Sequence, residues 1–170
     1  MKNVKMGVEE YKISDEGLKI RMEYIERIGD ILEEFMEECK ERFGLNLVSI
    51  VLFGSYARGK ATKYSDIDLL AVVKNLPRDW RERDRILDDL ERYFLKKRHK
   101  RIFPILTTPE AIINSVKRGN PLFYGILTGY AILFDRDDFF KKEMEEVKAM
   151  VRDEKPIFYD KVGKWNLAEI

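Results

Sequence analysis

The sequence has very few of the residues that build disulfides and common metal centres. Among 170 residues there is one cysteine, Cys39, one histidine, His99, and no glutamine. A single cysteine cannot form an intrachain disulfide, so a secreted disulfide-stabilised fold is excluded. One cysteine with one histidine is too few for the usual structural zinc sites. A Ser/His/Asp or Cys/His triad would have to use His99, which lies inside a basic run, and is therefore disfavoured.

Long apolar runs are also absent. No stretch approaches the roughly 20 apolar residues that a membrane-spanning helix needs. The first residues, MKNVKMGVEEYKI, lack the apolar segment of a signal peptide. We therefore expect a soluble cytoplasmic protein with no membrane partner.

The charges are dense but balanced. Lys and Arg number 32 and Asp and Glu 31, so the net charge is +1. Overall charge therefore favours neither nucleic acid nor a membrane as a partner. One run, 96–101 (KKRHKR), is basic at five of its six positions. It fits either contact with a polyanion or a helix end whose cations complement the helix dipole, and the second interpretation is favoured. Scarce Gln and Cys beside abundant Lys, Arg and Glu are typical of thermophile proteins.

Hydrophobic periodicity predicts alternating helices and strands. Apolar residues at three- and four-residue steps indicate one long helix, and short apolar β-rich runs indicate buried strands. In chain order we expect helix 14–43, strand 45–53, strand 67–73, helix 79–97, strand 101–106, helix 108–119, helix 120–128, strand 129–134 and a helix from 135 or 137 to 152. This order predicts an α/β (α+β) domain with a mixed β-sheet core and flanking helices, over 14–152. Residues 1–13 form an extension and 153–170 a tail.

The connection between the first two strands holds the most informative residues. Ten residues separate Gly54-Ser55 from Asp66-Ile67-Asp68. Because side chains alternate along a strand, Asp66 and Asp68 should project on the same face, with Ile67 toward the core. Two carboxylates this close repel each other unless a cation lies between them. Mg²⁺ suits such a pair, because it prefers one or two carboxylates together with phosphate oxygens.

The other end of this loop offers groups that suit a phosphate. Gly54 lets the backbone approach a ligand closely, and Ser55 carries a hydroxyl. Tyr56-Ala57-Arg58 can form a first helical turn with free N–H groups, and Arg58 and Ser65 could add contacts. Each signal is weak alone. Together they predict a metal-bridged nucleoside triphosphate site for phosphoryl or nucleotidyl transfer.

A second interpretation of the loop is a Walker A phosphate loop. Residues 54–60 read G-x-x-x-x-G-K, but the next residue is Ala61 where that motif needs Ser or Thr. A helix must also follow, and Asp66 leaves little room for one. An ordinary P-loop NTPase is therefore disfavoured.

The segment GSYARGKATKYSDIDL resembles the signature of the DNA polymerase beta-like nucleotidyltransferase superfamily, most closely its minimal nucleotidyltransferases. The resemblance covers residues 48–73, and NPLFYGILTGYAILFD is similar, less specifically, to the closing helix and strand of such domains. It implies an α/β catalytic core in which Asp66 and Asp68 hold two Mg²⁺ ions and Gly54 and Ser55 grip the triphosphate. It also implies attack of an acceptor hydroxyl on the α-phosphate of ATP or another nucleoside triphosphate, with loss of pyrophosphate.

The resemblance leaves the acceptor open. A small molecule is one option. A protein tyrosine is another, since some minimal nucleotidyltransferases are antitoxins that adenylylate an all-helical HEPN-type toxin. Templated polymerisation is disfavoured because 170 residues leave no room for duplex-gripping domains. An oligomer is compatible with the sequence.

One feature of this family is missing from the sequence. Active relatives usually carry a third carboxylate on a later strand, and the matching strand here, RIFPIL, has no acid. Glu110 and Asp135 are the nearest substitutes, although each also fits a structural role at a helix start. The alternative to an enzyme is therefore a non-catalytic module that binds nucleotide or a partner through the same loop.

Overall fold

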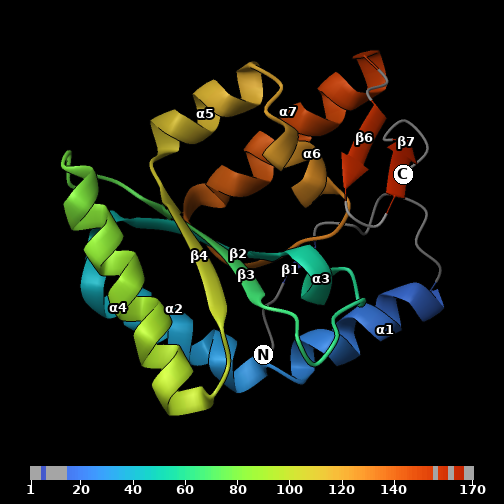
Figure 1. Cartoon of the computed structure of the whole chain (residues 1–170). Helices are drawn as coiled ribbons and strands as arrows, with labels where there is room; N and C mark the ends of the chain where they lie inside the picture. The colour runs from blue at the N-terminus through green and yellow to red at the C-terminus, as the bar shows by residue number, and fades with distance from the viewer. Residues whose placement is uncertain (1–4, 7–14, 155–156, 161–162, 167–170) are drawn as a thin grey trace.

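The computed structural model describes residues 5–6, 15–154, 157–160 and 163–166, with side chains for 15–153. A five-stranded mixed sheet has the order β1-β5-β2-β3-β4 and carries helices on both faces (Figure 1). The expectation of an α/β (α+β) domain with a mixed sheet and flanking helices is confirmed. The elements are β1 (Lys5–Met6), α1 (Asp15–Glu26), α2 (Gly29–Phe43), β2 (Leu47–Phe53), α3 (Gly54–Ala57), β3 (Ile67–Val73), α4 (Trp80–Arg98), β4 (Ile102–Thr107), α5 (Pro109–Lys117), α6 (Pro121–Leu127), β5 (Ala131–Asp135), α7 (Phe139–Glu154), β6 (Ile157–Asp160) and β7 (Gly163–Asn166), with short 3₁₀ turns at Gly44–Asn46 and Arg136–Asp138.

Alternation along the central strands creates two cores, one on each face of the sheet. In β3, Ile67 and Leu69 pack toward α1, α2 and α4, whereas Leu70 and Val72 pack toward α5, α6 and α7. Both faces are covered, so β2 and β3 are apolar almost throughout. Asp68 is the acidic exception in β3 and lies on the face of α5–α7.

The strand pairing brings the site residues to one end of the sheet. β2 and β3 are antiparallel, with Phe53 opposite Asp68, and β4 runs parallel to β3 with Phe103 beside Asp68. β4 is an edge strand, a position that tolerates a proline. The Arg101 carbonyl accepts from Ile67 N–H. By the alternation of a parallel ladder, the backbone nitrogen of the buried Pro104 then faces the free side of β4, where no ladder bond needs an N–H.

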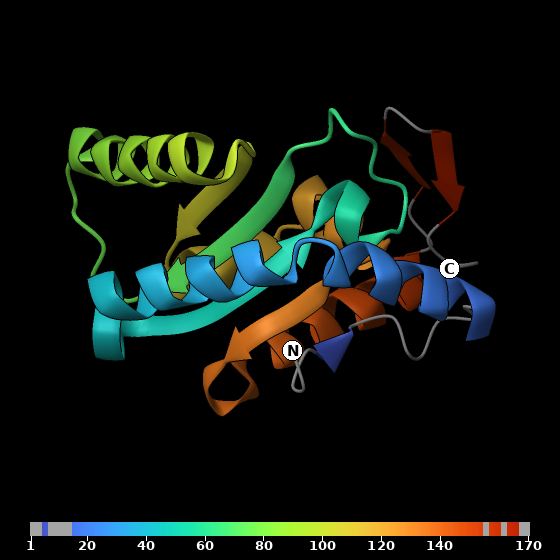
Figure 2. The ribbon, with the colours of Figure 1, turned by 90° about the horizontal axis from the view of Figure 1, so that it is seen from below.

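The prediction of a single long helix over 14–43 is wrong. The chain forms two helices, which meet at a bend at Arg27-Ile28 (Figure 2). Ile28 N–H bonds to Ile25 in a tighter turn, and Gly29, a poor helix former, follows. Ile28 is buried at the bend. The bend lets α1 pack beside α3 while α2 packs against the sheet.

Both ends of the chain add strands that the sequence did not predict. β1 lies within the expected extension 1–13 and pairs antiparallel with β5 as an outer strand. β6 and β7 form a separate hairpin within the expected tail 153–170. The side chains of the aromatic residues in this tail lie outside the described residues. In the described ranges, no helix combines the length and apolar character needed to cross a bilayer.

A carboxylate of α2 ties this helix to the end of α4. Glu34 accepts from Tyr93 Oη at 2.6 Å, from Arg98 Nε at 2.5 Å and from Lys97 Nζ. Asp30 adds a second contact to Arg98 at 3.1 Å. Hydrogen bonds from Lys97 and Tyr93 lower the pKa of Glu34 to about 2. Part of the basic run 96–101 therefore fastens two helices together, in addition to complementing the helix dipole.

We expect Glu34→Gln to lower the free energy of unfolding at pH 7 by about 1 kcal/mol, the upper range for a partly exposed ion pair. Because the fold lowers the pKa of Glu34, its stabilisation is complete above about pH 4.5 and is lost as the pH falls toward 2. Urea unfolding across this range should show the difference from wild type shrinking. Glu37→Gln, which removes only an exposed contact to Lys40, is the control. A constant difference down to pH 2 would contradict the assignment.

Candidate nucleotide and metal site

The candidate site forms where β2 ends and β3 begins. The antiparallel register sets Phe53 opposite Asp68, so Gly54 and Ser55 lie next to the carboxylate. Gly54 has φ +71°, a conformation that L residues with side chains rarely adopt. This turn directs the chain from β2 straight into α3. The ten-residue spacing seen in the sequence is therefore the loop that returns from α3 to β3.

Asp68 packs directly against the backbone at Gly54. A Cβ atom at residue 54 would lie 1.9 Å from Asp68 Oδ2, which is a severe clash. The backbone N–H of Ser55 donates a hydrogen bond to the Asp68 carboxylate. Glycine is therefore required at residue 54 for two separate reasons, its backbone conformation and the space that the carboxylate occupies.

The charges of Asp66 and Asp68 interact in the structure. Burial first, and then the charge of Asp66, raise the pKa of Asp68 to about 6. The Arg58 charge and the Ser55 N–H oppose this rise in pKa but do not overcome it. Asp66 is more exposed, and its Oδ1 lies 3.7 Å from Arg101 Nε. Two adjacent acids, one of them poorly solvated, make a pair that binding of a cation would stabilise.

These groups fit a divalent cation of the hard, oxygen-binding kind. Asp66 and Asp68 supply two carboxylates at one end of the sheet, where β3 begins, and phosphate oxygens would complete the coordination. Among the described residues, no cluster of three or more His, Cys, Asp or Glu side chains forms a metal centre. The chain thus provides a two-carboxylate site that needs ligands from its substrate.

Arg58 lies at the end of α3, within electrostatic reach of Asp68. Its Nη1 is 3.4 Å from the Thr128 hydroxyl, while Arg21 Nη2 donates to the Thr128 carbonyl at 3.3 Å. Burial first, and then the Arg58 charge, lower the pKa of Arg21. Gly129 leaves room for both arginines, because a Cβ there would lie 2.7 Å from Arg58 Cγ. Two like charges held this close favour an anion beside them.

Ser65 has a role within its own loop. Its hydroxyl accepts from the Thr62 N–H at 2.9 Å, and its N–H donates to the Thr62 carbonyl at 3.1 Å. This turn closes the loop before Asp66. A contact between Ser65 and a nucleotide stays a prediction.

The Walker A interpretation does not fit the structure. The only helix in this segment, α3, ends at Ala57, before Gly59 and Lys60. No helix follows Lys60 before β3 begins. Ala61 packs against the hydrophobic core.

Neither substitute for the third carboxylate reaches the site. The β4 residue beside Asp68 is Phe103, whose side chain is 54% exposed. β4 runs away from Asp68, so Glu110 lies beyond its far end, more than about 13 Å along the strand. Asp135 pairs with Ser49, roughly 13 Å along β2 from Phe53. Its carboxylate accepts from Ser49 Oγ at 2.6 Å and caps the start of α7. Both acids fit the structural roles already considered for them.

Sequence reasoning missed the partners that orient this site. Thr128 and Arg21 contact Arg58, and Arg101 lies beside Asp66. Arg21 and Thr128 lie 37 or more positions from Arg58 in the sequence. Arg101 belongs to the basic run 96–101, which was interpreted as a helix end. No local signal in the sequence marks them.

Two solved structures match much of the chain at low sequence identity. A toxin–antitoxin crystal structure with AMP-PNP matches 72% of this chain and 89% of its own, at 17% identity and a TM-score of 0.48. A chain from the structure of a tri-AMPylated Shewanella oneidensis HEPN toxin in complex with MNT antitoxin matches 74% of this chain and 88% of its own, at 15% identity and a TM-score of 0.44.

Sequence relatives are closer. A putative protein adenylyltransferase of Methanocaldococcus jannaschii is 46% identical over 84% of this chain and 96% of its own length. The protein adenylyltransferase MntA of Thermococcus cleftensis is 40% identical over 31% of this chain and 52% of its own length. The nucleotidyltransferase domain profile matches residues 32–127, more than half of the chain, including β2, α3 and β3. The chain therefore belongs to the nucleotidyltransferase domain family.

Proposed function

We propose that this chain is an Mg²⁺-dependent nucleotidyltransferase that moves AMP from ATP to a hydroxyl group of a protein acceptor and releases pyrophosphate. One observation carries the proposal: the partly buried Asp68 carboxylate is fitted against Gly54 and Ser55 N–H, and the charge of Asp66 acts on it. This geometry has a cost in the free protein, because it raises the pKa of Asp68 to about 6. Bound cation and triphosphate would offset that cost.

Each residue has a distinct role in the proposed reaction. Asp66 and Asp68 would hold Mg²⁺, which lowers the charge repulsion that an incoming nucleophile meets at a phosphate. The turn at Gly54 and Ser55 would bind the triphosphate through N–H groups. Arg58, backed by Arg21, would stabilise the negative charge of the phosphates. The acceptor oxygen forms a bond to the α-phosphorus as the bond from this phosphorus to the pyrophosphate oxygen breaks.

A protein acceptor is favoured over a small molecule. The M. jannaschii relative, which spans most of this chain, is described as a putative protein adenylyltransferase, and the T. cleftensis relative as a protein adenylyltransferase. A HEPN-type protein is the partner to test first, with an aminoglycoside as the small-molecule alternative.

A nucleotide-binding module without transfer is the second candidate. The observation in its favour is Phe103, which occupies the place on β4 beside Asp68 where an acid would complete the metal site. With two carboxylates, one Mg²⁺ can still enter with the triphosphate, but a second ion lacks an anionic ligand.

Label transfer from ATP distinguishes the two candidates. The chain would be incubated with Mg²⁺ and ATP labelled at the α-phosphate, alone and with cell extract or a HEPN-type protein. A transferase should label a macromolecular acceptor and release pyrophosphate. ATP binding by calorimetry, without labelling or pyrophosphate, would support the binding module.

Asp66→Asn and Asp68→Asn should each abolish Mg²⁺-dependent ATP binding or transfer while the fold survives. Loss of a carboxylate removes a metal ligand. In Asp68→Asn it also removes a partly buried charge, which should leave the apo protein equally or more stable. Calorimetry with and without Mg²⁺, together with thermal melting, measures both effects. Asp88→Asn, on the exposed face of α4, is the control. Wild-type metal dependence in either site variant would refute the metal assignment.

Gly54→Ala should weaken ATP binding at least about tenfold and destabilise the fold by roughly 1–3 kcal/mol, because it combines a positive φ with the clash at Asp68. Gly44→Ala is a matched control, because φ there is +50° and nothing lies within 4 Å of the new Cβ. It should share the backbone strain and keep ATP binding. Equal ATP affinity in the two variants would show that the fit of Gly54 against Asp68 has no role in binding.

Phe103→Asp should raise the rate of transfer to simple acceptors, because it sets a third carboxylate beside Asp68 on the neighbouring strand. The exposed side chain makes this a mild change for the fold. Phe103→Asn is the control, because asparagine is similar in size to aspartate but carries no charge. The measurement is the rate of AMP transfer with each variant at saturating ATP. Rapid transfer by the isolated wild-type chain, unchanged in Phe103→Asp, would show that no third carboxylate is needed.

A further inference from the structure

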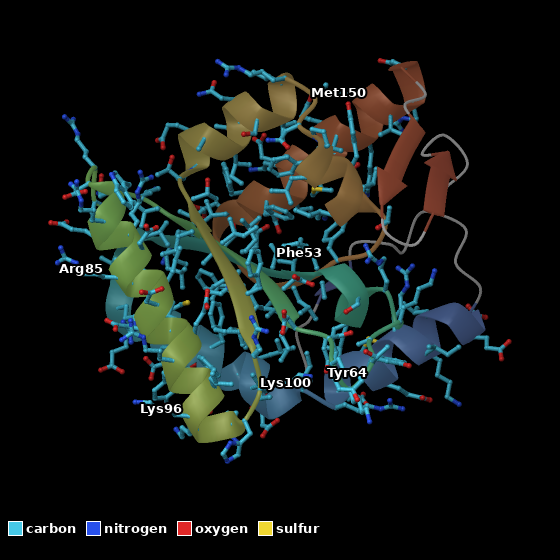
Figure 3. The ribbon with its side chains drawn as sticks, viewed as in Figure 1. Phe53, Tyr64, Arg85, Lys96, Lys100 and Met150 are labelled. Atoms are coloured by element: carbon cyan, nitrogen blue, oxygen red, sulfur yellow. The ribbon has the colours of Figure 1, made fainter. Side chains whose placement is uncertain are left out.

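A pocket lies at the bend between α1 and α2. It has a volume of about 440 Å³ and is lined by Tyr24, Arg27, Tyr56, Lys63, Arg98 and Lys100, among others. This size is within the range of small-molecule sites in proteins. Figure 3 labels Lys100 and the neighbouring loop residue Tyr64 at this part of the molecule.

The charged side chains that line this pocket are all cationic. Its lining includes four cationic side chains and, in the part of the chain that the structure describes, no Asp or Glu. Arg98 is neutralised by Glu34 and Asp30. For Arg27, Lys63 and Lys100, no carboxylate in the described ranges comes within 4 Å. Three uncompensated cations around one hollow produce a local positive potential that attracts an anion.

Two tyrosine rings hold cations at the pocket. Arg27 lies over the ring of Tyr24 at 4.7 Å from its centroid, and Lys100 over the ring of Tyr56 at 5.2 Å. Such contacts restrict long side chains that would otherwise move freely in solvent. Tyr56 itself is buried. The cations are thus partly ordered before any ligand arrives, which lowers the entropy cost of binding.

This pocket is separate from the candidate nucleotide site. Its lining includes none of the residues predicted to bind nucleotide or metal. Tyr56 packs in the core of α1, α2 and α4, whereas Asp68 lies on the face of α5–α7. One wall, at Ala61–Lys63, belongs to the loop that leads to Asp66, so a ligand here would also order that loop.

The surrounding acids favour a small anion over a nucleic acid strand. Glu34 contacts Lys97 as well as Arg98, and Arg101 lies beside Asp66. Acidic side chains therefore pair with three of the five basic residues of the run 96–101, while Lys100 lines the pocket. A nucleic acid backbone needs a continuous basic stripe.

We propose that this pocket is a second ligand site, which binds a small phosphorylated or polyphosphate anion no larger than a mononucleotide. The proposal stands independently of the function proposed for the Asp66–Asp68 site.

Calorimetry with the whole chain and sodium tripolyphosphate, in EDTA and at low ionic strength, tests the proposal. We expect saturable binding at one site per chain. The double variant Lys63→Gln/Lys100→Gln should weaken it at least about tenfold, because each cation contributes a charged hydrogen bond. The matched control Lys74→Gln/Lys96→Gln removes two exposed lysines outside the pocket and should bind as wild type does. Absence of binding, or an equal loss in both double variants, would overturn the proposal.

Two further arms locate the anion and identify its class. Arg58→Gln should leave tripolyphosphate binding intact while weakening ATP binding with Mg²⁺, and the opposite pattern would move the anion to the nucleotide site and overturn the proposal. A ten-nucleotide oligouridylate should bind more weakly than tripolyphosphate. Tighter oligouridylate binding that is lost in Lys63→Gln/Lys100→Gln would replace the small anion with single-stranded nucleic acid. Unchanged thermal melting confirms that each variant is folded.

Discussion

The site depends on one close contact, between the Asp68 carboxylate and the backbone at Gly54-Ser55. The carboxylate occupies the space that a Cβ at residue 54 would need, and it accepts a hydrogen bond from Ser55 N–H. This contact joins the end of β2 to the start of β3 and sets the direction in which α3 leaves the sheet. The two-core fold supports it, because the alternation that buries Ile67 and Leu69 on one face leaves Asp68 on the other.

The contact is costly in the free protein, and this cost connects fold to function. Burial and the neighbouring Asp66 disfavour ionisation of Asp68, so the carboxylate is maintained against its own electrostatic preference. Strained or poorly solvated groups persist where the surrounding structure over-determines them, and they concentrate at functional sites. The Arg21–Arg58 pair shows the same pattern with the opposite sign, since two cations share Thr128. A divalent cation with a polyphosphate would neutralise both clusters at once.

Sequence patterns predicted most of the strands and helices because buried strands and amphipathic helices carry a periodic signal. The same periodicity gave a wrong prediction of one helix where α1 and α2 form two, because the apolar stripe continues across the bend. The helical backbone hydrogen bonds are interrupted there by the tight turn at Ile28 and by Gly29. β1 was missed because two residues are too few to show alternation. For the site, the spacing of Gly54, Asp66 and Asp68 was informative because a strand fixes the faces of neighbouring residues. Thr128 and Arg21 were not predictable, because only tertiary packing brings them to Arg58.

The placement of Phe103 sets the chemical character of the site on its acceptor side. The register aligns Phe53, Asp68 and Phe103 in one row across β2, β3 and β4, so the central carboxylate has an aromatic residue on each neighbouring strand. Phe103 is more than half exposed, and β4 is an edge strand whose Pro104 opposes pairing with a further strand. In the proposed transfer reaction, an acceptor would approach Asp68 over an apolar side chain rather than by extending the sheet. Such an approach would favour a hydroxyl carried on an apolar or aromatic group of a folded partner over a freely diffusing, highly hydrated one.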